Sequence, residues 1–520
     1  MVTNSQDSNP VDYDAIVVGA GFGGLCMLHE LRKQGMAAKL IDAAGDVGGT
    51  WYWNRYPGAR TDSESWSYIV NFSPEVKQEW NWTERFSLQG EVHEYLRHVA
   101  DRFDMRKEIQ FGTRVESAHY QDRENHWAIR TDRGDAYTCR FFITAAGVLS
   151  AGRRPPFPGI DSFQGDWYVT SEWPKEKIDF TGKRVAVIGT GATGVQIIPT
   201  LAHVAKSEHR TEIKRNYEAI WEQAQSQVFG FAMPIVGRTL PDVTDPAQQR
   251  KILEAGWEAG GFRFVFGTFD DLLTNPQANE LASAFVREKI RTIVKDPKTA
   301  ELLCPRYPLL AKRPPLGHFY YEAYNRPNVH LVDVSTYGIE EITPKGLRLG
   351  NGDEYEFDVI IYAIGFDAVT GALTRMDIRG RNGRVLASEF STRPETFLGI
   401  MVDDYPNMFT ISGPQSPFAN MPVVIDTVVM WIGKALAMMR KRNATRVEVK
   451  RSAVDWWCEQ VRAAFEASVL ATSSAQVHSW YVGANVPGKP ANVLFYFGGL
   501  VAYIDHCRRE AEGGFPNLIF

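Results

Sequence analysis

The sequence predicts an α/β fold with two Rossmann-like dinucleotide-binding domains and a helical insertion. Two glycine-rich turns carry this prediction, and each lies between an apolar run and a helical pattern: Gly19-Ala20-Gly21-Phe22-Gly23-Gly24 after Ala15 to Val18, and Gly189-Thr190-Gly191-Ala192-Thr193-Gly194 after Val185 to Ile188. One such turn is weak evidence, because glycine-rich turns are common, but two copies in this setting are strong evidence. A chain that holds two dinucleotides is expected to move electrons between them.

Residues 14 to 42 form the first predicted β-α-β unit. Its helix has one apolar face, is expected to end at Gly35, and is flanked by strands at Ala15 to Val18 and Ala38 to Ile41. Asp42 closes the second strand, at the spacing where an acidic residue meets the ribose of a dinucleotide. A solvated strand end is the alternative for Asp42, and the spacing from the glycines favours the ribose.

The rest of the chain divides around these two units. Further buried strands are predicted within residues 141–147, 356–366 and 407–414, and the proline-rich stretch 153–159 is typical of a linker. Residues 211–300 look mostly helical and carry no nucleotide signature. We therefore expect a first dinucleotide-binding domain at 1–148 and 369–520, a second one at 149–210 and 306–368, and a helical insertion at 211–305.

Composition excludes several classes of protein. The net charge of −5 gives no reason to expect a nucleic acid or an anionic membrane as partner. The five cysteines are scattered without a CxxC pair, which argues against structural zinc and against a secreted disulfide framework. The N-terminus lacks the features of a signal peptide, and the apolar stretch 493–504 is too short to span a membrane. A reducing, cytoplasmic setting and no obligate protein partner are expected.

Two longer motifs make the chain resemble the Baeyer–Villiger monooxygenases over nearly its whole length. The fingerprint GxWxxxx[FY]P[GM]xxxD is met by Gly49, Trp51, Tyr56, Pro57, Gly58 and Asp62. The fingerprint FxGxxxHxxxW[PD] is met by Phe163, Gly165, Trp173 and Pro174, with Val169 at the histidine position. Members of this family reduce FAD with NADPH and add O₂ at the flavin C4a carbon. The resulting peroxyflavin attacks a ketone and yields an ester or a lactone.

The resemblance implies a catalytic pair. A cation should sit beside the peroxide and the oxyanion, and an arginine stays protonated at any working pH. The matching residue is Arg313, with Asp62 to hold its guanidinium. A surface ion pair and a helix-capping carboxylate are the ordinary alternatives for these two residues.

The resemblance also implies two cofactor sites, for FAD and for NADPH. The expected FAD-binding residues are Gly19, Gly21, Gly24, Asp42, Gly49, Thr50, Trp51, Trp53, Tyr68, Val115 and Met421, with Asp62 nearby. The expected NADPH-binding residues are Gly189, Thr190, Gly191, Thr193, Gly194, Gln196, Arg60, Thr61, Lys312 and Trp480. Within these sets Lys312 would meet the 2′-phosphate and Trp480 the nicotinamide end. The alternative for Lys312 is a side chain exposed to solvent, and the alternative for Trp480 is a side chain that packs in the core.

Two departures from the family pattern affect the second site. Val169 cannot form the side-chain hydrogen bonds of a histidine, so we expect reduced or uncoupled activity. In addition, the strand that should follow the helix through Lys206 is missing, because the next eight residues are polar and helix-like. Either a segment has been closed up between Lys206 and Ser207, or the deletion is genuine. A genuine deletion would make a preference for NADPH over NADH doubtful.

Three other functions are alternatives to ketone oxygenation. An N- or S-oxygenating flavin monooxygenase shares both nucleotide folds, but the complete first fingerprint and Arg313 count against it. A disulfide reductase needs a pair of redox cysteines, which the sequence lacks. A flavin-binding member without turnover stays open because of Val169 and the missing strand. Candidate walls of an apolar pocket for a cyclic or bulky ketone are Phe262, Phe264, Phe418, Ala419 and Met421, although core packing explains them equally well.

Overall fold

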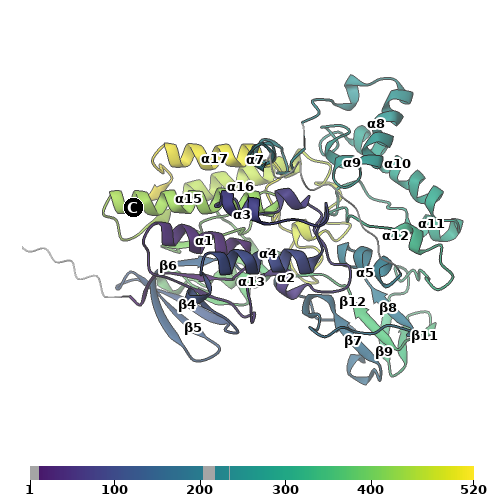
Figure 1. Cartoon of the computed structure of the whole chain (residues 1–520), viewed down its shortest axis with the longest axis horizontal. Helices are drawn as coiled ribbons and strands as arrows, with labels where there is room; N and C mark the ends of the chain where they lie inside the picture. Colours follow the sequence, from purple (N-terminus) through teal and green to yellow (C-terminus); the bar gives the residue numbers. More distant parts are fainter. Residues whose placement is uncertain (1–10, 203–216, 234) are drawn as a thin grey trace, which may run out of the picture.

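The computed structural model describes residues 11–202, 217–233 and 235–520, and it confirms the α/β fold. Two separate sheets lie in different parts of the molecule, and a group of helices lies beside the smaller sheet (Figure 1). Each of the two glycine-rich turns follows a parallel strand, one in each sheet. The predicted arrangement of two dinucleotide folds is therefore present.

The larger sheet is assembled from two distant parts of the chain. Its order is β13-β4-β5-β6-β1-β2-β3, with β14 paired to β6. Strand β1 lies between β6 and β2, and all three are parallel, so their carboxyl ends meet at one edge. The bounds are β1 (Tyr13–Val18), β2 (Ala38–Ile41), β3 (Ile109–Gln110), β4 (Val115–Gln121), β5 (His126–Thr131), β6 (Ala136–Thr144), β13 (Asp377–Arg379) and β14 (Met408–Thr410).

Helices from both ends of the chain cover one face of this sheet. Along β1, Ala15 and Val17 belong to one hydrophobic cluster and Ile16 to another, so the strand is buried on both faces. The first cluster is closed by α1 (Phe22–Lys33), α15 (Met421–Lys441) and α17 (Leu500–Glu512), which lie side by side (Figure 1). The other helices around this sheet are α2 (Thr50–Trp53), α3 (Pro74–Glu79), α4 (Gln89–Arg102), α13 (Gly371–Thr374), α14 (Leu386–Thr392) and α16 (Arg451–Glu466).

The smaller sheet has the order β7-β12-β8, and all its strands are parallel. Its bounds are β7 (Asp166–Val169), β12 (Val359–Tyr362) and β8 (Val185–Ile188), followed by α5 (Ala192–Ala202). Among the described residues, β8 pairs with β12 on one side and with no strand on the other. The predicted junction between Lys206 and Ser207 lies outside the described residues. A three-stranded antiparallel sheet of β9 (Ile339–Thr343), β10 (Gly346–Leu349) and β11 (Glu354–Glu356) precedes β12.

The inserted helices begin at Asp-Pro or Asn-Pro pairs. Asp245, Asn275 and Asp296 cap α8 (Pro246–Ala259), α10 (Pro276–Ile293) and α11 (Pro297–Leu303), and their side chains accept backbone N–H groups of the first turns at 3.1, 3.0 and 2.8 Å. Proline suits the next position because its missing N–H would have no partner there. Short α9 (Arg263–Phe266) and α12 (Tyr320–Ala323) complete the group, which lies beside the smaller sheet (Figure 1).

Helix α7 (Tyr217–Ser226) falls within the range expected for the insertion, yet it packs elsewhere. Its Tyr217 and Trp221 belong to the core cluster of the larger sheet, and the helix contacts α17. The chain therefore returns to the larger sheet between α5 and α8.

Helix α15 is long and apolar enough to cross a membrane by length and composition alone. However, 61% of its most apolar window is buried inside the protein, where it packs between α1 and α17. It is therefore a core helix.

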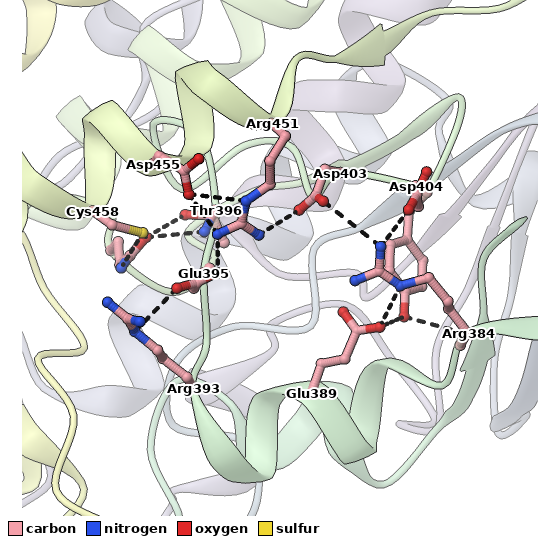
Figure 2. A network of polar contacts seen from close by, with 12 residues as sticks. Arg384, Glu389, Arg393, Glu395, Thr396, Asp403, Asp404, Arg451, Asp455 and Cys458 are labelled. Carbon is pink, nitrogen blue, oxygen red and sulfur yellow. Dashed lines mark hydrogen bonds and ion pairs between the residues drawn. The ribbon is translucent and has the colours of Figure 1, made fainter.

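A network of charged side chains joins the segment that precedes β14 to α14 and α16 (Figure 2). Asp403 contacts Arg451 of α16 and Arg384 before α14, at 3.3 and 3.7 Å. Close to Arg451, the side-chain oxygen of Gln415 accepts from the backbone N–H of Thr396 at 3.0 Å. Gln415 has a left-handed backbone (φ 67°), which is strained for a residue with a side chain, so its buried side chain stabilises an otherwise costly turn.

A buried lysine links three helices of the larger domain. The ammonium group of Lys77 in α3 donates to Asn71 at 2.7 Å and to Glu218 of α7 at 3.1 Å, and its side chain is only 2% exposed. Asn71 in turn donates to Asp426 of α15 at 3.0 Å.

Replacing Lys77 with methionine should therefore destabilise the fold. Charge-assisted hydrogen bonds from buried groups contribute about 2 kcal/mol, so Lys77→Met should lower the Tm by a few degrees in a thermal melt. Lys107→Met is the control, because Lys107 is 61% exposed and its ion pair with Asp104 lies at the surface. Equal Tm changes in the two variants would contradict this account.

Candidate active site

A cleft opens at the carboxyl edge of β1, β2 and β6. Its lining includes ten of the eleven residues expected to bind FAD: Gly19, Gly21, Asp42, Gly49, Thr50, Trp51, Trp53, Tyr68, Val115 and Met421. The lining also includes Arg114, Arg375, Pro422 and Ile425, which were not predicted from the sequence. The N-terminus of a long helix beside the cleft favours a ligand that carries partial negative charge.

The first glycine turn has the tightly packed backbone expected of a turn that binds a dinucleotide. A Cβ on Gly19 would lie 2.4 Å from the carbonyl oxygen of Ala145, and a Cβ on Gly24 would lie 1.8 Å from that of Gly19. Gly24 does not line the cleft, so its small size serves the packing of α1 on β1. The N-terminus of α1 is thereby held where its free N–H groups can receive a pyrophosphate.

The second turn repeats the same contacts. A Cβ on Gly189 would lie 2.3 Å from the carbonyl oxygen of Ala363, and one on Gly194 would lie 2.3 Å from that of Gly189. The middle glycine, Gly191, has no protein atom near its missing side chain and is exposed. Packing therefore explains why positions 189 and 194 hold glycine. The glycine at position 191 instead leaves the surface of the turn uncovered.

Asp42 stabilises the first turn directly. Its carboxylate accepts from the backbone N–H of Ala20 at 2.5 Å and from that of Ala44 at 2.7 Å. Burial raises the pKa of Asp42, and these two hydrogen bonds oppose that shift. The residue also lines the cleft, so a ribose contact is compatible with this structural role.

The fingerprint loop after α2 joins the two dinucleotide folds. The hydroxyl of Tyr56 donates to the Gln196 side chain of α5 at 2.9 Å, and the Gln196 amide donates to the carbonyl of Arg60 at 3.2 Å. Gly58 has a positive φ, and a Cβ there would lie 2.4 Å from the carbonyl of Gln196. The buried side chain of Gln196, expected at the NADPH phosphates, is thus already engaged with this loop.

Arg313 and Asp62 form an ion pair, as the resemblance implied. The guanidinium carbon of Arg313 also lies 5.8 Å from the ring centre of Phe262. Burial lowers the pKa of Arg313, and the nearby hydroxyls of Tyr481 and Tyr56 oppose that shift. Arginine nevertheless keeps its charge at working pH, so the site holds a permanent, partly buried cation.

Arg313 lies in the segment between α11 and α12, and Asn279 of α10 holds this segment in place. The Asn279 side chain accepts from the backbone N–H of Leu309 at 2.9 Å and donates to the carbonyl of the same residue at 2.8 Å. Asn279 is buried, as is Ala311. The helical insertion therefore fixes the position of the segment that carries Arg313.

A second acidic residue of the fingerprint loop, Glu64, was not predicted. Its carboxylate is only 3% exposed and binds Arg85 at 2.7 Å and Arg263 of α9 at 3.2 Å. Arg263 directly follows Phe262, so this triad fixes the ring that covers Arg313. Its position two residues after Asp62 was the only signal in the sequence.

Aromatic side chains form a packed cluster near this cation, which is called the aromatic chamber below. The ring of Phe418 lies 4.7 Å from that of Tyr481, 5.5 Å from Phe495 and 5.6 Å from Phe497. Trp480 is half-buried in the same cluster, 5.1 Å from Tyr481. Of the predicted pocket walls, Phe262, Phe264 and Phe418 belong to the same hydrophobic cluster, Ala419 packs against the core of the larger sheet, and Met421 lines the cleft.

The other residues that we expect to bind NADPH differ in burial and in their contacts. Thr190 is exposed beside Gly191, and Thr193 is half-buried in the first turn of α5. Arg60 pairs with Glu84 at 3.1 Å, while the hydroxyl of buried Thr61 donates to the carbonyl of Ser63. Lys312 lies over the ring of Tyr307 at 5.5 Å, and burial lowers its pKa. Val169 ends β7 and packs against the apolar cluster of the smaller sheet.

Comparison with known proteins identifies the family. A Baeyer–Villiger monooxygenase of Pseudooceanicola batsensis is 41% identical, and the alignment covers 99% of this chain and 98% of that protein. The chain belongs to the Baeyer–Villiger monooxygenases. Residues 14–216 also match the model of the flavin-binding monooxygenase-like family. A crystal structure of OTEMO in complex with FAD and NADP has a TM-score of 0.91 and 37% identity, with 98% of this chain and 99% of that chain covered.

This monooxygenase therefore uses FAD and NADPH, as the sequence indicated. The nearest alternative is represented by a phenazine N-monooxygenase, PhzNO1 of Lysobacter antibioticus, at 38% identity over 99% of this chain and 98% of that protein. The alignment with the Pseudooceanicola enzyme is 542 positions long, whereas this chain has 520 residues, so at least 22 positions have no residue here.

The two kinds of glycine in the second turn can be separated experimentally. Gly191→Ala should leave the Tm unchanged but weaken NADPH binding at least tenfold, because the methyl group would occupy the approach to the pyrophosphate. Gly189→Ala should destabilise the protein, because its Cβ would overlap a carbonyl oxygen. Thermal melts and titration with NADPH measure both effects. Gly90→Ala, at an equally open glycine in α4, is the control; normal NADPH affinity in Gly191→Ala would refute the assignment.

Proposed function

We propose that this enzyme inserts one oxygen atom next to the carbonyl of a ketone and releases an ester or a lactone. The observation that carries this proposal is the Arg313–Asp62 ion pair, held beside an aromatic chamber and on the same loop system that lines the flavin cleft. FAD, reduced by NADPH, supplies the activation of O₂ when it is bound.

The residues around Arg313 meet the electrostatic demands of the reaction. Negative charge develops on the substrate oxygen, and a cation fixed before the reaction stabilises that charge without reorganisation. Asp62 orients the guanidinium and balances its charge while the site is empty of substrate. The aromatic rings of Phe262, Phe418 and Trp480 exclude water, which limits loss of the activated oxygen as H₂O₂.

The remaining assignments follow from the same geometry. The cleft residues would hold FAD, with Asp42 at its ribose, and the turn from Gly189 to Gly194 would hold the NADPH pyrophosphate. Lys312 would meet the 2′-phosphate, and Trp480 would cover the nicotinamide end. We assign the larger sheet to the FAD domain and the smaller sheet to the NADPH domain. A cytoplasmic location fits the five cysteines, all of which are unpaired thiols.

The apolar chamber favours a cyclic or bulky ketone as substrate. A panel of linear, cyclic and aromatic ketones, with detection of esters and lactones, tests this directly. Planar aromatic N-heterocycles belong in the same panel, because N-oxide formation without ester or lactone products would favour the N-oxygenase alternative. NADPH-driven bleaching of the flavin spectrum would separate both from a flavin-binding protein without turnover.

Arg313 should act in oxygenation and not in flavin reduction. Arg313→Met should lower ketone oxygenation by about 10²–10³-fold, the usual loss for one donor at a developing oxyanion. Stopped-flow bleaching of the flavin by NADPH should change little, and H₂O₂ per NADPH should rise. Arg250→Met removes an equally good ion pair from the exposed face of α8 and serves as control. Oxygenation that survives in Arg313→Met would overturn the catalytic assignment.

Val169 should cause part of the NADPH to be wasted. It occupies the histidine position of the second fingerprint, and its apolar contacts cannot replace a hydrogen bond between domain segments. Val169→His should therefore lower the H₂O₂ formed per NADPH, whereas Val169→Ile should leave this ratio as it is. Equal coupling in the parent and in Val169→His would contradict the prediction.

A further inference from the structure

Two tyrosine hydroxyls lie close enough to Arg313 to feel its charge, and they differ in their partners. The hydroxyl of Tyr56 donates to Gln196 at 2.9 Å. The hydroxyl of Tyr481 is buried and has no hydrogen-bond partner within the part of the chain that the structure describes. Leaving a buried hydroxyl unpaired destabilises a fold, so its position beside a partly buried cation calls for an explanation.

The backbone around Tyr481 leaves its ring little freedom. The N–H of Tyr481 is bonded to the Ser479 side chain at 3.3 Å, and its carbonyl accepts from Leu494 at 2.9 Å. The ring lies 4.7 Å from that of Phe418 and 5.4 Å from that of Phe497, and the whole residue is 1% exposed. The hydroxyl is therefore held in place by packing and not by a polar partner.

Among the described residues no acceptor bonds to this hydroxyl. Arg313 and the indole N–H of Trp480 can only donate, and the rings of Phe418, Phe495 and Phe497 are hydrocarbon. Burial raises the pKa of Tyr481, so the group stays an O–H donor at working pH. What this position lacks is an oxygen atom that can accept from both Arg313 and Tyr481.

We propose that Tyr481 is a second hydrogen-bond donor to the carbonyl oxygen of the substrate, beside Arg313. The inference rests on the proposed function, since the ligand it requires is a ketone in the aromatic chamber. With this donor in place, the chamber selects an apolar molecule that carries an acceptor at one point. A purely hydrocarbon ligand would leave both donors unpaired.

Tyr481→Phe tests the proposal, with Tyr362→Phe as matched control. Tyr362 is also fully buried, and its hydroxyl has no partner among the described residues, but it lies in β12 in the core of the smaller sheet. Neither substitution should lower the Tm, because each removes a polar group that has no partner. For the best ketone of the panel, Tyr481→Phe should lower kcat/KM about tenfold, the loss expected for one hydrogen bond. Tyr362→Phe should leave it unchanged.

Binding measurements separate a hydrogen bond from packing. The probes are that ketone and its methylene analogue, in which =CH₂ replaces the carbonyl oxygen, each titrated against the flavin spectrum. Tyr481→Phe should bind the ketone more weakly than the parent does and the methylene analogue equally well. An unchanged affinity for the ketone, or an equal loss for both probes, would overturn the proposal. Failure of the parent to oxygenate any ketone would instead refute the proposed function.

Discussion

The ion pair between Arg313 and Asp62 is the interaction on which the arrangement of this site depends. It joins the loop that lines the flavin cleft to the segment that leaves the helical insertion. Each partner is held by contacts from another part of the chain: Asn279 anchors the segment before Arg313, and Gln196 anchors the loop before Asp62. The cation is therefore positioned by several elements at once, and such preorganisation is what makes a charge useful in catalysis.

The fold was predictable wherever local pattern and tertiary packing agree. The strands at Ala38 to Ile41 and Val185 to Ile188 have the predicted bounds, and β12 lies within the predicted range 356–366, because short apolar runs between turns suit buried parallel strands. Asp62 and Arg313 were found through the family motifs alone. Nothing in their separate neighbourhoods shows that residues 251 positions apart form an ion pair.

The residues that sequence reasoning missed share a physical feature. Glu64 and Tyr481 act through contacts with segments that are distant in sequence, and each looks ordinary where it stands. Helix α7 was misleading for the same reason, since an amphipathic pattern shows that a face is buried but not against which domain. Hydrophobic periodicity identifies helices and strands well, whereas contacts between domains become visible only in the three-dimensional structure.

The walls of the aromatic chamber come from α9, from the turn after β14 and from the segment that precedes α17, and none is a strand of either sheet. The glycine turns that we propose for the cofactors, by contrast, lie at strand ends, where a Cβ on Gly19, Gly24, Gly189 or Gly194 would clash with the backbone. Substitutions in the walls can thus change which molecules enter without disturbing the redox machinery. Such a separation lets a lineage diverge in substrate range while its electron transfer stays intact, because the two properties are encoded in different stretches of the gene.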